Sequence, residues 1–330
     1  MKKVLILGIG GQDSSYLAEH LIRNGDEVFG VHRRTSTGNL LRLNFIDPRV
    51  RSGIALRQGD LTDTESIIRI VREVDPDEIY NLADQDDVRW SFENAGYNYD
   101  VTGSAVGRLL QALLDEGKRR PFFQAISATV FGSTTEGNVS TPFDPRSPYA
   151  VAKLFALSLC RYYRKTHFYP VATAILFNHD SPRRGEGYLL QKICRQIVDF
   201  AEDPTVIEPA KFYNVDTLID VGPAEQYVKS FSHILRQHVK GDGEGDVIVG
   251  NGNRASIETL IMFALNSYRE LKGESINVED VFEFSNSDLI SPDPLWSGGT
   301  LETETGVSPT FAHGPLVEDI LSELLFGITL

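Results

Sequence analysis

A serine, a tyrosine and a lysine within residues 126–153 have the chemistry and the spacing of a site that oxidises a hydroxyl group. Tyr149 and Lys153 stand one helical turn apart, so they share one face of the helix predicted to start at residues 147–148. An ammonium beside a phenol lowers the pKa of the phenol from about 10 towards neutrality. Tyr149 is therefore a candidate general base for a hydroxyl proton, and Ser127 is a candidate hydrogen-bond partner of the same hydroxyl.

The Tyr-x-x-x-Lys spacing alone is weak evidence, because the chain contains it a second time, from Tyr188 to Lys192. The alternative is that Tyr149 and Lys153 are ordinary helix residues. A nucleotide-binding segment elsewhere in the chain favours the catalytic interpretation, and the N-terminus supplies one.

The N-terminal segment predicts a strand, a glycine turn and a helix in that order. Residues Val4–Leu7 form a short apolar run typical of a buried parallel strand, and a helical pattern follows the glycines. Glycines at this point let the backbone approach a pyrophosphate, whose charge is stabilised by the helix N-terminus. The predicted cofactor contacts in the turn are Gly8, Gly11, Gln12 and Asp13.

The segment after the second predicted strand, Glu27–Val31, indicates which dinucleotide binds. At this point an acidic residue would bind the 2′-hydroxyl of the adenosine ribose, whereas arginine accommodates a 2′-phosphate. Arg33 and Arg34 stand here, so NADP is favoured over NAD, with a solvated basic turn as the alternative. After a third strand, Asp60 and Leu61 are expected near the adenine.

A fourth predicted strand, Glu78–Leu82, ends beneath the expected cofactor, because ligands of open α/β sheets bind beyond the carboxyl ends of the strands. The further predicted cofactor contacts are therefore Leu82, Ala83 and Gln85. A helix over about 98–116 precedes the strand that carries Ser127.

Strands that alternate with helices predict an α/β fold with a doubly wound parallel sheet of the Rossmann type. We assign residues 1–180 to the NADP-binding domain, with later segments interleaved. Residues 181–330 are assigned to a smaller C-terminal substrate-binding lobe, because the pattern loosens there.

The composition excludes several classes of function. A formal charge of -14 disfavours nucleic-acid binding, which needs clustered Lys and Arg. A hydrophobic fraction of 41% without a long apolar run predicts a globular cytoplasmic protein with no membrane partner. Cys160 and Cys194 have no metal-ligand spacing, so we expect buried reduced thiols and no metal site.

Six segments in order carry a family resemblance: GQDSSYLAEHL, HRRTS, GDLTD, EIYNLADQ, TPFDPRSPYAVAKL and ILFNHDSPRRG. Together they resemble the extended short-chain dehydrogenase/reductases that act on nucleotide sugars, and among these the GDP-mannose 4,6-dehydratases most closely. The resemblance covers residues 1 to about 230. It implies a nucleotide-sugar or nucleoside substrate. It also implies a homodimer or homotetramer, since residues 34–42 resemble the segment by which these dehydratases reach a neighbouring subunit's cofactor site.

The catalytic segment departs from that pattern. A 4,6-dehydratase removes water across C5 and C6 of a 4-keto sugar and needs a second acid/base group there, which is the Glu of Thr-Ser-Glu in the dehydratases. Here the segment is Ser127-Ala128-Thr129, and a threonine hydroxyl does not serve as that base at ordinary pH. Residues 127–132 are instead similar to Ser-Ala-Thr-Val-Tyr-Gly of the UDP-galactose 4-epimerases.

The substrate side departs as well. Ile219 stands where the dehydratases place an Arg at the substrate diphosphate, and residues 291–294 replace their later Arg-Pro element. Asp86 stands where they carry Ser, which favours hydroxyl-rich or cationic substrate groups, or simply a helix cap. The candidate substrate contacts are Asp86, Asn178, Arg183 and Lys192, and Arg184 is a further candidate anion contact. Solvent or interprotomer contact is the alternative for the basic residues. His179 beside Asp180 suggests a dyad, although a structural carboxylate partner is favoured.

The sequence therefore predicts an NADP-dependent epimerase that transiently oxidises a secondary hydroxyl of a nucleotide sugar or nucleoside-linked sugar. The predicted catalytic residues are Ser127, Tyr149, Lys153 and Thr129. The alternative reactions are dehydration with a substituted base and oxidation with release of the keto sugar. A protein that binds the dinucleotide without turnover is the alternative from a different class, and the intact Ser, Tyr and Lys argue against it.

Overall fold

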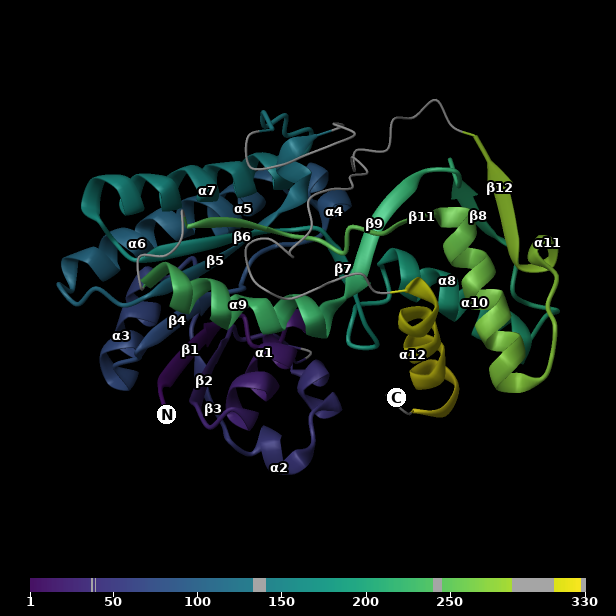
Figure 1. The fold of residues 1–330 in the computed structure, drawn as a ribbon, viewed down its shortest axis with the longest axis horizontal. Helices are drawn as coiled ribbons and strands as arrows, with labels where there is room; N and C mark the ends of the chain where they lie inside the picture. Colours follow the sequence, from purple (N-terminus) through teal and green to yellow (C-terminus); the bar gives the residue numbers. More distant parts are fainter. Residues whose placement is uncertain (37, 39, 133–140, 240–244, 287–311, 328–330) are drawn as a thin grey trace.

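The computed structural model describes residues 1–36, 38, 40–132, 141–239, 245–286 and 312–327. The predicted apolar runs form one parallel sheet of seven strands (Figure 1). In order across the sheet these are β10 (Asp246–Val249), β6 (Val171–Leu176), β5 (Phe122–Ser127), β4 (Glu78–Asn81), β1 (Lys3–Leu7), β2 (Glu27–His32) and β3 (Ile54–Gln58). All six pairings are parallel, which confirms the doubly wound α/β fold.

Helices cover both faces of the sheet, which is why its strands are apolar on both sides (Figure 1). One layer holds α1 (Gln12–Arg23) and α9 (Ala224–Val239), and the other holds α3 (Thr64–Val74), α6 (Ala105–Asp115) and α7 (Pro148–His167). Short segments complete this part: η1 (Leu41–Phe45), α2 (Pro48–Arg51), α4 (Val88–Glu93), α5 (Ala95–Asn98), η2 (Tyr99–Ser104) and η3 (Ala128–Phe131).

The chain order reverses between β1 and β4, and in open α/β sheets this is the point where ligands bind beyond the carboxyl ends of the strands. Gly8 allows the turn after β1 to lie close to the loop that follows β4. Its φ is +83°, and a Cβ there would lie 2.7 Å from Cα of Ala83, which follows β4. A residue with a side chain would clash with backbone and also adopt a strained conformation.

The helix predicted over 98–116 is divided in the structure. The chain forms α5, then the π-helical segment η2, and only then α6. A wider turn lets η2 pack closely against α7, since a Cβ on Gly103 would lie 3.1 Å from the Phe155 ring. The same segment directs Thr102 Oγ1 to accept a hydrogen bond from the Gln85 backbone N–H at 3.2 Å. Such π segments are frequent at functional sites, and they are hard to predict from periodicity.

A smaller group of elements follows β6. It contains the three-stranded sheet β11 (Arg254–Ser256), β9 (Leu218–Pro223) and β7 (Asn178–Asp180), and the pair β12 (Phe282–Ser285) and β8 (Ala210–Tyr213). Its helices are α8 (Leu189–Glu202), α10 (Ile257–Lys272), α11 (Val278–Val281) and α12 (His313–Phe326). These elements enclose a second hydrophobic core. Strand β10 of the main sheet and helix α9, which packs on that sheet, come from the same half of the chain. A domain boundary at residue 180 therefore stays a prediction.

The two cysteines are buried free thiols, Cys160 in the main core and Cys194 in the second core. Within the described ranges, no helix has both the length and the apolar character needed to cross a membrane. Residues 291–294, expected to replace the dehydratase Arg-Pro element, lie outside the described residues.

Candidate active site

The N-terminus of α7 places the predicted Tyr and Lys side by side. Ser147 caps the helix by accepting a hydrogen bond from the Ala150 N–H at 3.1 Å, and Pro148 occupies the first turn, as predicted. Tyr149 and Lys153 are both buried on the inner face of α7, with 7% and 3% of their surfaces exposed. The Lys153 ammonium lies 5.7 Å from the centre of the Tyr149 ring.

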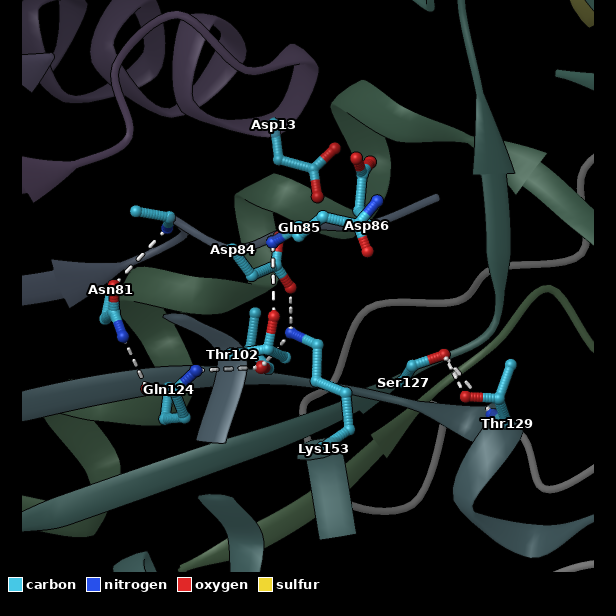
Figure 2. A network of polar contacts seen from close by, with 12 residues as sticks. Asp13, Asn81, Asp84, Gln85, Asp86, Thr102, Gln124, Ser127, Thr129 and Lys153 are labelled. Atoms are coloured by element: carbon cyan, nitrogen blue, oxygen red, sulfur yellow. Dashed lines mark hydrogen bonds and ion pairs between the residues drawn. The ribbon is translucent and has the colours of Figure 1, made fainter. Parts of the chain in front are cut away.

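Lys153 is held by two acceptors from neighbouring strands of the sheet. Its ammonium donates to the Ala125 carbonyl of β5 at 2.9 Å and forms an ion pair with Asp84, which follows β4 (Figure 2). The exposed fractions of the two charged side chains are 4% and 15%. A buried ammonium without such partners would carry a large desolvation cost.

Ser127 and Thr129 form a second polar pair at the end of β5. Thr129 donates to Ser127 Oγ through its hydroxyl at 3.0 Å and through its backbone N–H at 3.3 Å (Figure 2). The segment therefore presents hydroxyl groups and no carboxylate where the dehydratase pattern carries Glu.

The structure corrects the expectation that Lys153 lowers the pKa of Tyr149. Burial first, and then the negative charges of Asp84 and Asp86, raise this pKa well above 10.0, although a hydrogen bond with Ser127 acts in the opposite direction. The ammonium of Lys153 has a partner, Asp84, that is distant from it in the sequence. Because Asp84 neutralises Lys153, the positive charge that would favour the phenolate is compensated.

The predicted glycine turn is present between β1 and α1, and its contact with a pyrophosphate stays a prediction. The Gly11 N–H donates to the Gly8 carbonyl at 3.0 Å, and α1 starts at Gln12 with no side chain capping its first turn. The hydroxyl of Ser14, third in the G-x-x-G-x-x-S spacing, is buried and has no hydrogen-bond partner among the described residues. An unpaired buried donor beside an open helix N-terminus fits the phosphate groups of a dinucleotide.

A cavity of about 460 Å³ lies beyond the end of β2. Its lining residues include His32, Arg33, Arg34, Thr35 and Gln58. The Thr35 hydroxyl is also buried without a partner in the described part of the chain. Two guanidinium groups and an unpaired hydroxyl around one cavity fit an anionic group.

Asp60 and Leu61 follow the lining residue Gln58 in the sequence, but they are not among the residues that line the cavity. Asp60 accepts hydrogen bonds from the Thr62 N–H at 2.9 Å and from its hydroxyl at 2.8 Å, so it closes its own turn. Leu61 is buried. Their contact with an adenine stays a prediction.

The loop after β4 lies beside the glycine turn, as predicted. The Leu82 N–H donates to the Leu7 carbonyl at 3.1 Å, and Ala83 is the close neighbour of Gly8. The side chain of Gln85 donates to the Asp87 carbonyl at 3.1 Å and accepts from Asn98, so Gln85 shapes the loop.

Gln12 and Asp13 connect the glycine turn to the β7 segment. Gln12 accepts from the Ser181 hydroxyl at 2.8 Å, and Asp13 lies 2.9 Å from Nε2 of His179. The carboxylate partner of His179 is thus Asp13 from α1, and the favoured structural role of this histidine is consistent with that pairing.

Asp86 faces a positively charged neighbour. Arg184 lies 3.5 Å from the Asp86 carboxylate and stacks 3.6 Å above the Tyr188 ring, and Tyr188 shares a hydrogen bond with Asp86. Asp86 is half exposed, which leaves it accessible to a ligand. The helix-capping alternative belongs to its neighbour Asp87, which accepts from the Trp90 N–H at 2.8 Å.

The other predicted substrate residues differ in burial and in their neighbours. Arg183 is buried against α1, where it contacts Glu19 at 2.6 Å and stacks 3.8 Å above the Tyr16 ring. Asn178 and Lys192 are exposed on β7 and α8. Of the paired arginines, the structure therefore brings Arg184 to the Asp86 loop.

Two residues that were not assigned from the sequence contribute to the site. Asp84 binds Lys153, and Arg42 donates to the carbonyls of Gly10 at 3.1 Å and Arg183 at 2.7 Å. Arg184, a candidate anion contact from the sequence, binds Asp86. The acidic segment after β4 was a visible signal for Asp84. Arg42 joins two distant loops, and no local pattern indicates this. The described residues contain no group of three or more metal-ligating side chains arranged to hold an ion.

Comparison with known proteins relates this arrangement to one family. The family model for GDP-mannose 4,6 dehydratase matches residues 5–294. A GDP-mannose 4,6-dehydratase of Yersinia enterocolitica is 36% identical over 334 residues, which cover 98% of this chain and 87% of that protein. One of Vibrio cholerae is 41% identical over 268 residues, covering 79% and 70%.

Solved structures support the fold. A dTDP-glucose 4,6-dehydratase of Streptomyces venezuelae with bound NAD has a TM-score of 0.80 at 20% identity, with 98% of each chain covered. A UDP-glucuronic acid 4-epimerase of Bacillus cereus in complex with UDP-glucuronic acid and NAD has a TM-score of 0.77 at 19% identity, covering 98% of this chain and 99% of that one. The relatives in sequence are dehydratases, so they favour dehydration over the epimerisation that the sequence analysis ranked first.

The buried pair of Asp13 and His179 predicts a pH-dependent contribution to stability. Burial lowers the pKa of His179, but the charge and hydrogen bond of Asp13 outweigh it and raise the pKa above 6.5. A group whose pKa is raised in the folded state contributes stability that is fully present below its unfolded-state pKa. This stability is lost as pH rises through its folded-state pKa. Asp13, whose pKa is lowered to about 2 by His179 in spite of burial, stays ionised throughout this range.

We expect His179→Gln to lower the free energy of unfolding by about 1–3 kcal/mol near pH 6 and by clearly less near pH 9. Thermal unfolding of the variant and the wild type at both pH values measures the difference. His233→Gln, on α9, is the control for removal of an imidazole. An equal cost at both pH values would contradict a charged His179.

Proposed function

Because the chain belongs to the GDP-mannose 4,6-dehydratase family and is therefore an enzyme of the extended short-chain dehydrogenase/reductase type, we propose that it dehydrates a GDP-linked hexose through a 4-keto intermediate. The observation that carries the oxidation step is the position of Tyr149 and Lys153 on α7 beside Ser127 at the end of β5. The dehydratase relatives support the elimination step.

In this proposal Tyr149 accepts the proton of the sugar C4 hydroxyl, and Ser127 hydrogen-bonds the same oxygen. A dinucleotide held at the glycine turn and the open N-terminus of α1 would supply reversible hydride acceptance, so that oxidation at C4 and reduction at C6 would balance once water is lost across C5 and C6. The balance involves no external oxidant, since the product differs from the substrate by one water molecule. Lys153 stays beneath the phenol and Ala125 orients its ammonium.

Elimination requires a group that removes the C5 proton, and Thr129 does not supply it. We propose Asp86 for this role, because its carboxylate is half exposed and belongs to the loop that borders Tyr149. Arg184 and Tyr188 hold the carboxylate in place. Asn178 and Lys192, both exposed, are proposed contacts for the rest of the nucleotide sugar.

Epimerisation remains a second candidate because of one observation. The hydroxyl of Thr129 is bound to Ser127 at 3.0 Å, so the segment is organised without any carboxylate. Transient oxidation and return of hydride to the opposite face would require only Ser127, Tyr149 and Lys153.

The reaction is tested by incubating the protein with NADP and GDP-mannose in deuterated water and analysing the product by mass spectrometry. Dehydration predicts loss of one water molecule together with uptake of solvent deuterium. Tyr149→Phe should reduce the rate by about a hundredfold or more, whereas Tyr162→Phe on the same helix should not. A product of unchanged mass without deuterium would contradict dehydration and support epimerisation, and full activity of Tyr149→Phe would exclude both.

We propose NADP as the cofactor, on the basis of the cavity that Arg33 and Arg34 line. Arg33 donates to the Tyr97 hydroxyl at 2.5 Å, which fixes one guanidinium, and Arg34 is exposed at the cavity rim. A 2′-phosphate next to these groups would gain charge-assisted hydrogen bonds that a 2′-hydroxyl does not provide.

Arg34→Ala should weaken NADPH binding by about tenfold to a hundredfold, the effect of one charge-assisted hydrogen bond, and should leave NADH binding unchanged. Fluorescence titration of the two reduced cofactors measures both. Arg49→Ala removes an exposed guanidinium that pairs with Asp47, so it controls for net charge. Equal losses for both cofactors would contradict recognition of a 2′-phosphate.

We also propose that the protein forms a homodimer or homotetramer through the outer face of α7. Apolar and aromatic side chains are about half exposed along this face and the adjoining η2: Tyr99, Val151, Phe155 and Tyr162. An apolar face of this kind on a globular enzyme is typical of a subunit interface.

Phe155→Glu should place a charge in the proposed interface and shift the protein to monomers, as measured by light scattering during size-exclusion chromatography. Val206→Glu, at a 68% exposed position after α8, is the matched control and should keep the wild-type mass. A wild-type protein that is monomeric at micromolar concentration would exclude the proposal.

A further inference from the structure

Asp84 is a buried carboxylate in direct contact with the catalytic lysine. It follows β4 by three residues and lies beside Lys153, which extends from α7 across the end of β5 (Figure 2). Only 15% of the Asp84 side chain is exposed, so water screens the pair poorly. Nothing in the expected mechanism uses this residue.

The contact alters what Lys153 can do for its neighbour. An isolated ammonium 5.7 Å from the phenol ring would favour the phenolate. With Asp84 against it, the ammonium and the carboxylate form a neutral pair, and the carboxylate itself repels a phenolate. Ala125 fills another position around the ammonium, which fixes the lysine in this arrangement.

We propose that Asp84 is a positioning residue that holds the Lys153 ammonium and thereby keeps Tyr149 protonated in the resting site. The inference rests on the proposed role of Tyr149 as the proton acceptor and adds how that role is controlled. Tyr149 must lose its own proton before it can accept one from the substrate. This loss then requires either alkaline pH or a ligand that draws Asp84 away from Lys153.

Burial is the first cause that raises the pKa of Tyr149, and among the charged groups around it Asp84 has the largest effect. The charged and titratable neighbours are Asp84 and Asp86 after β4, Tyr188 before α8, and Lys153 on α7 itself. Asp86 is half exposed and lies next to Arg184, so solvent and an opposite charge both weaken its field at the phenol. Tyr188 is neutral, because burial and Asp86 raise its pKa.

The protonation state of Tyr149 can be measured in the protein without cofactor or substrate. Phenolate absorbance is followed against pH, and the spectrum of Tyr149→Phe is subtracted to remove the other tyrosines. We expect no Tyr149 phenolate in the wild type at pH 9. A phenolate signal already present there would overturn the proposal, whatever reaction the enzyme catalyses.

Asp84→Asn should move the ionisation of Tyr149 to lower pH, because it removes the carboxylate and keeps a hydrogen-bond acceptor for Lys153. In turnover, the ratio of kcat at pH 7 to kcat at pH 9 should rise by about tenfold or more, the factor that one pH unit represents. In the absorbance titration, which involves no turnover, Asp86→Asn should shift the ionisation of Tyr149 less than Asp84→Asn does, and Asp100→Asn, at an exposed ion pair with Arg108, should not shift it.

Asp84→Glu restores a carboxylate and should return the pH profile towards that of the wild type, which a merely structural role would not require. If Asp84→Asn does not fold, Asp84→Ser provides a neutral hydroxyl for the same comparison. An unchanged ionisation of Tyr149 in the folded neutral variant would overturn the proposal. Because the absorbance titration involves no substrate, its outcome is separate from that of the dehydration experiment.

Discussion

The buried ammonium of Lys153 is the constraint on which the arrangement of the site depends. A charge in this position is tolerated only with close acceptors, and these come from two different strand ends, the Ala125 carbonyl of β5 and the carboxylate of Asp84 after β4. The order of the sheet makes this possible, because β4 and β5 are neighbours and end at the same edge. Packing of η2 against α7 then fixes the helix that carries the lysine. Fold and chemistry are thus coupled through one side chain.

The local parts of the site could be predicted from the sequence because local rules determine them. The cap at Ser147, the proline after it and the one-turn spacing of Tyr149 and Lys153 specify the start and inner face of α7. The glycine turn was predictable for a similar reason, since only glycine accepts the conformation at Gly8 and the contact with Ala83. The doubly wound parallel sheet followed from short apolar runs alternating with helices.

The electrostatic parts could not be predicted in this way, because they depend on residues that are distant in sequence. Lys153 and Asp84 are joined only when β4 and α7 are assembled, so the sign of the effect on Tyr149 was predicted wrongly from the lysine alone. The partner of His179 is Asp13 from the first helix, not the adjacent aspartate. Neighbouring arginines illustrate the same limit: a backbone turn sends Arg183 to α1 and Arg184 to Asp86.

The paired charges of the candidate site bear on how a dinucleotide would be held. Lys153, His179 and Arg184 each lie against a carboxylate, Asp84, Asp13 and Asp86 respectively, so the interior of the site carries little net positive charge. Attraction for the phosphates must therefore come from elsewhere. In the proposed cofactor site, the open N-terminus of α1 would supply it for the pyrophosphate, and the arginines beyond β2 would supply it at the adenosine end. Phosphate binding would in this way be separated from the reacting centre, where burial and the carboxylates of Asp84 and Asp86 act on the protonation of Tyr149.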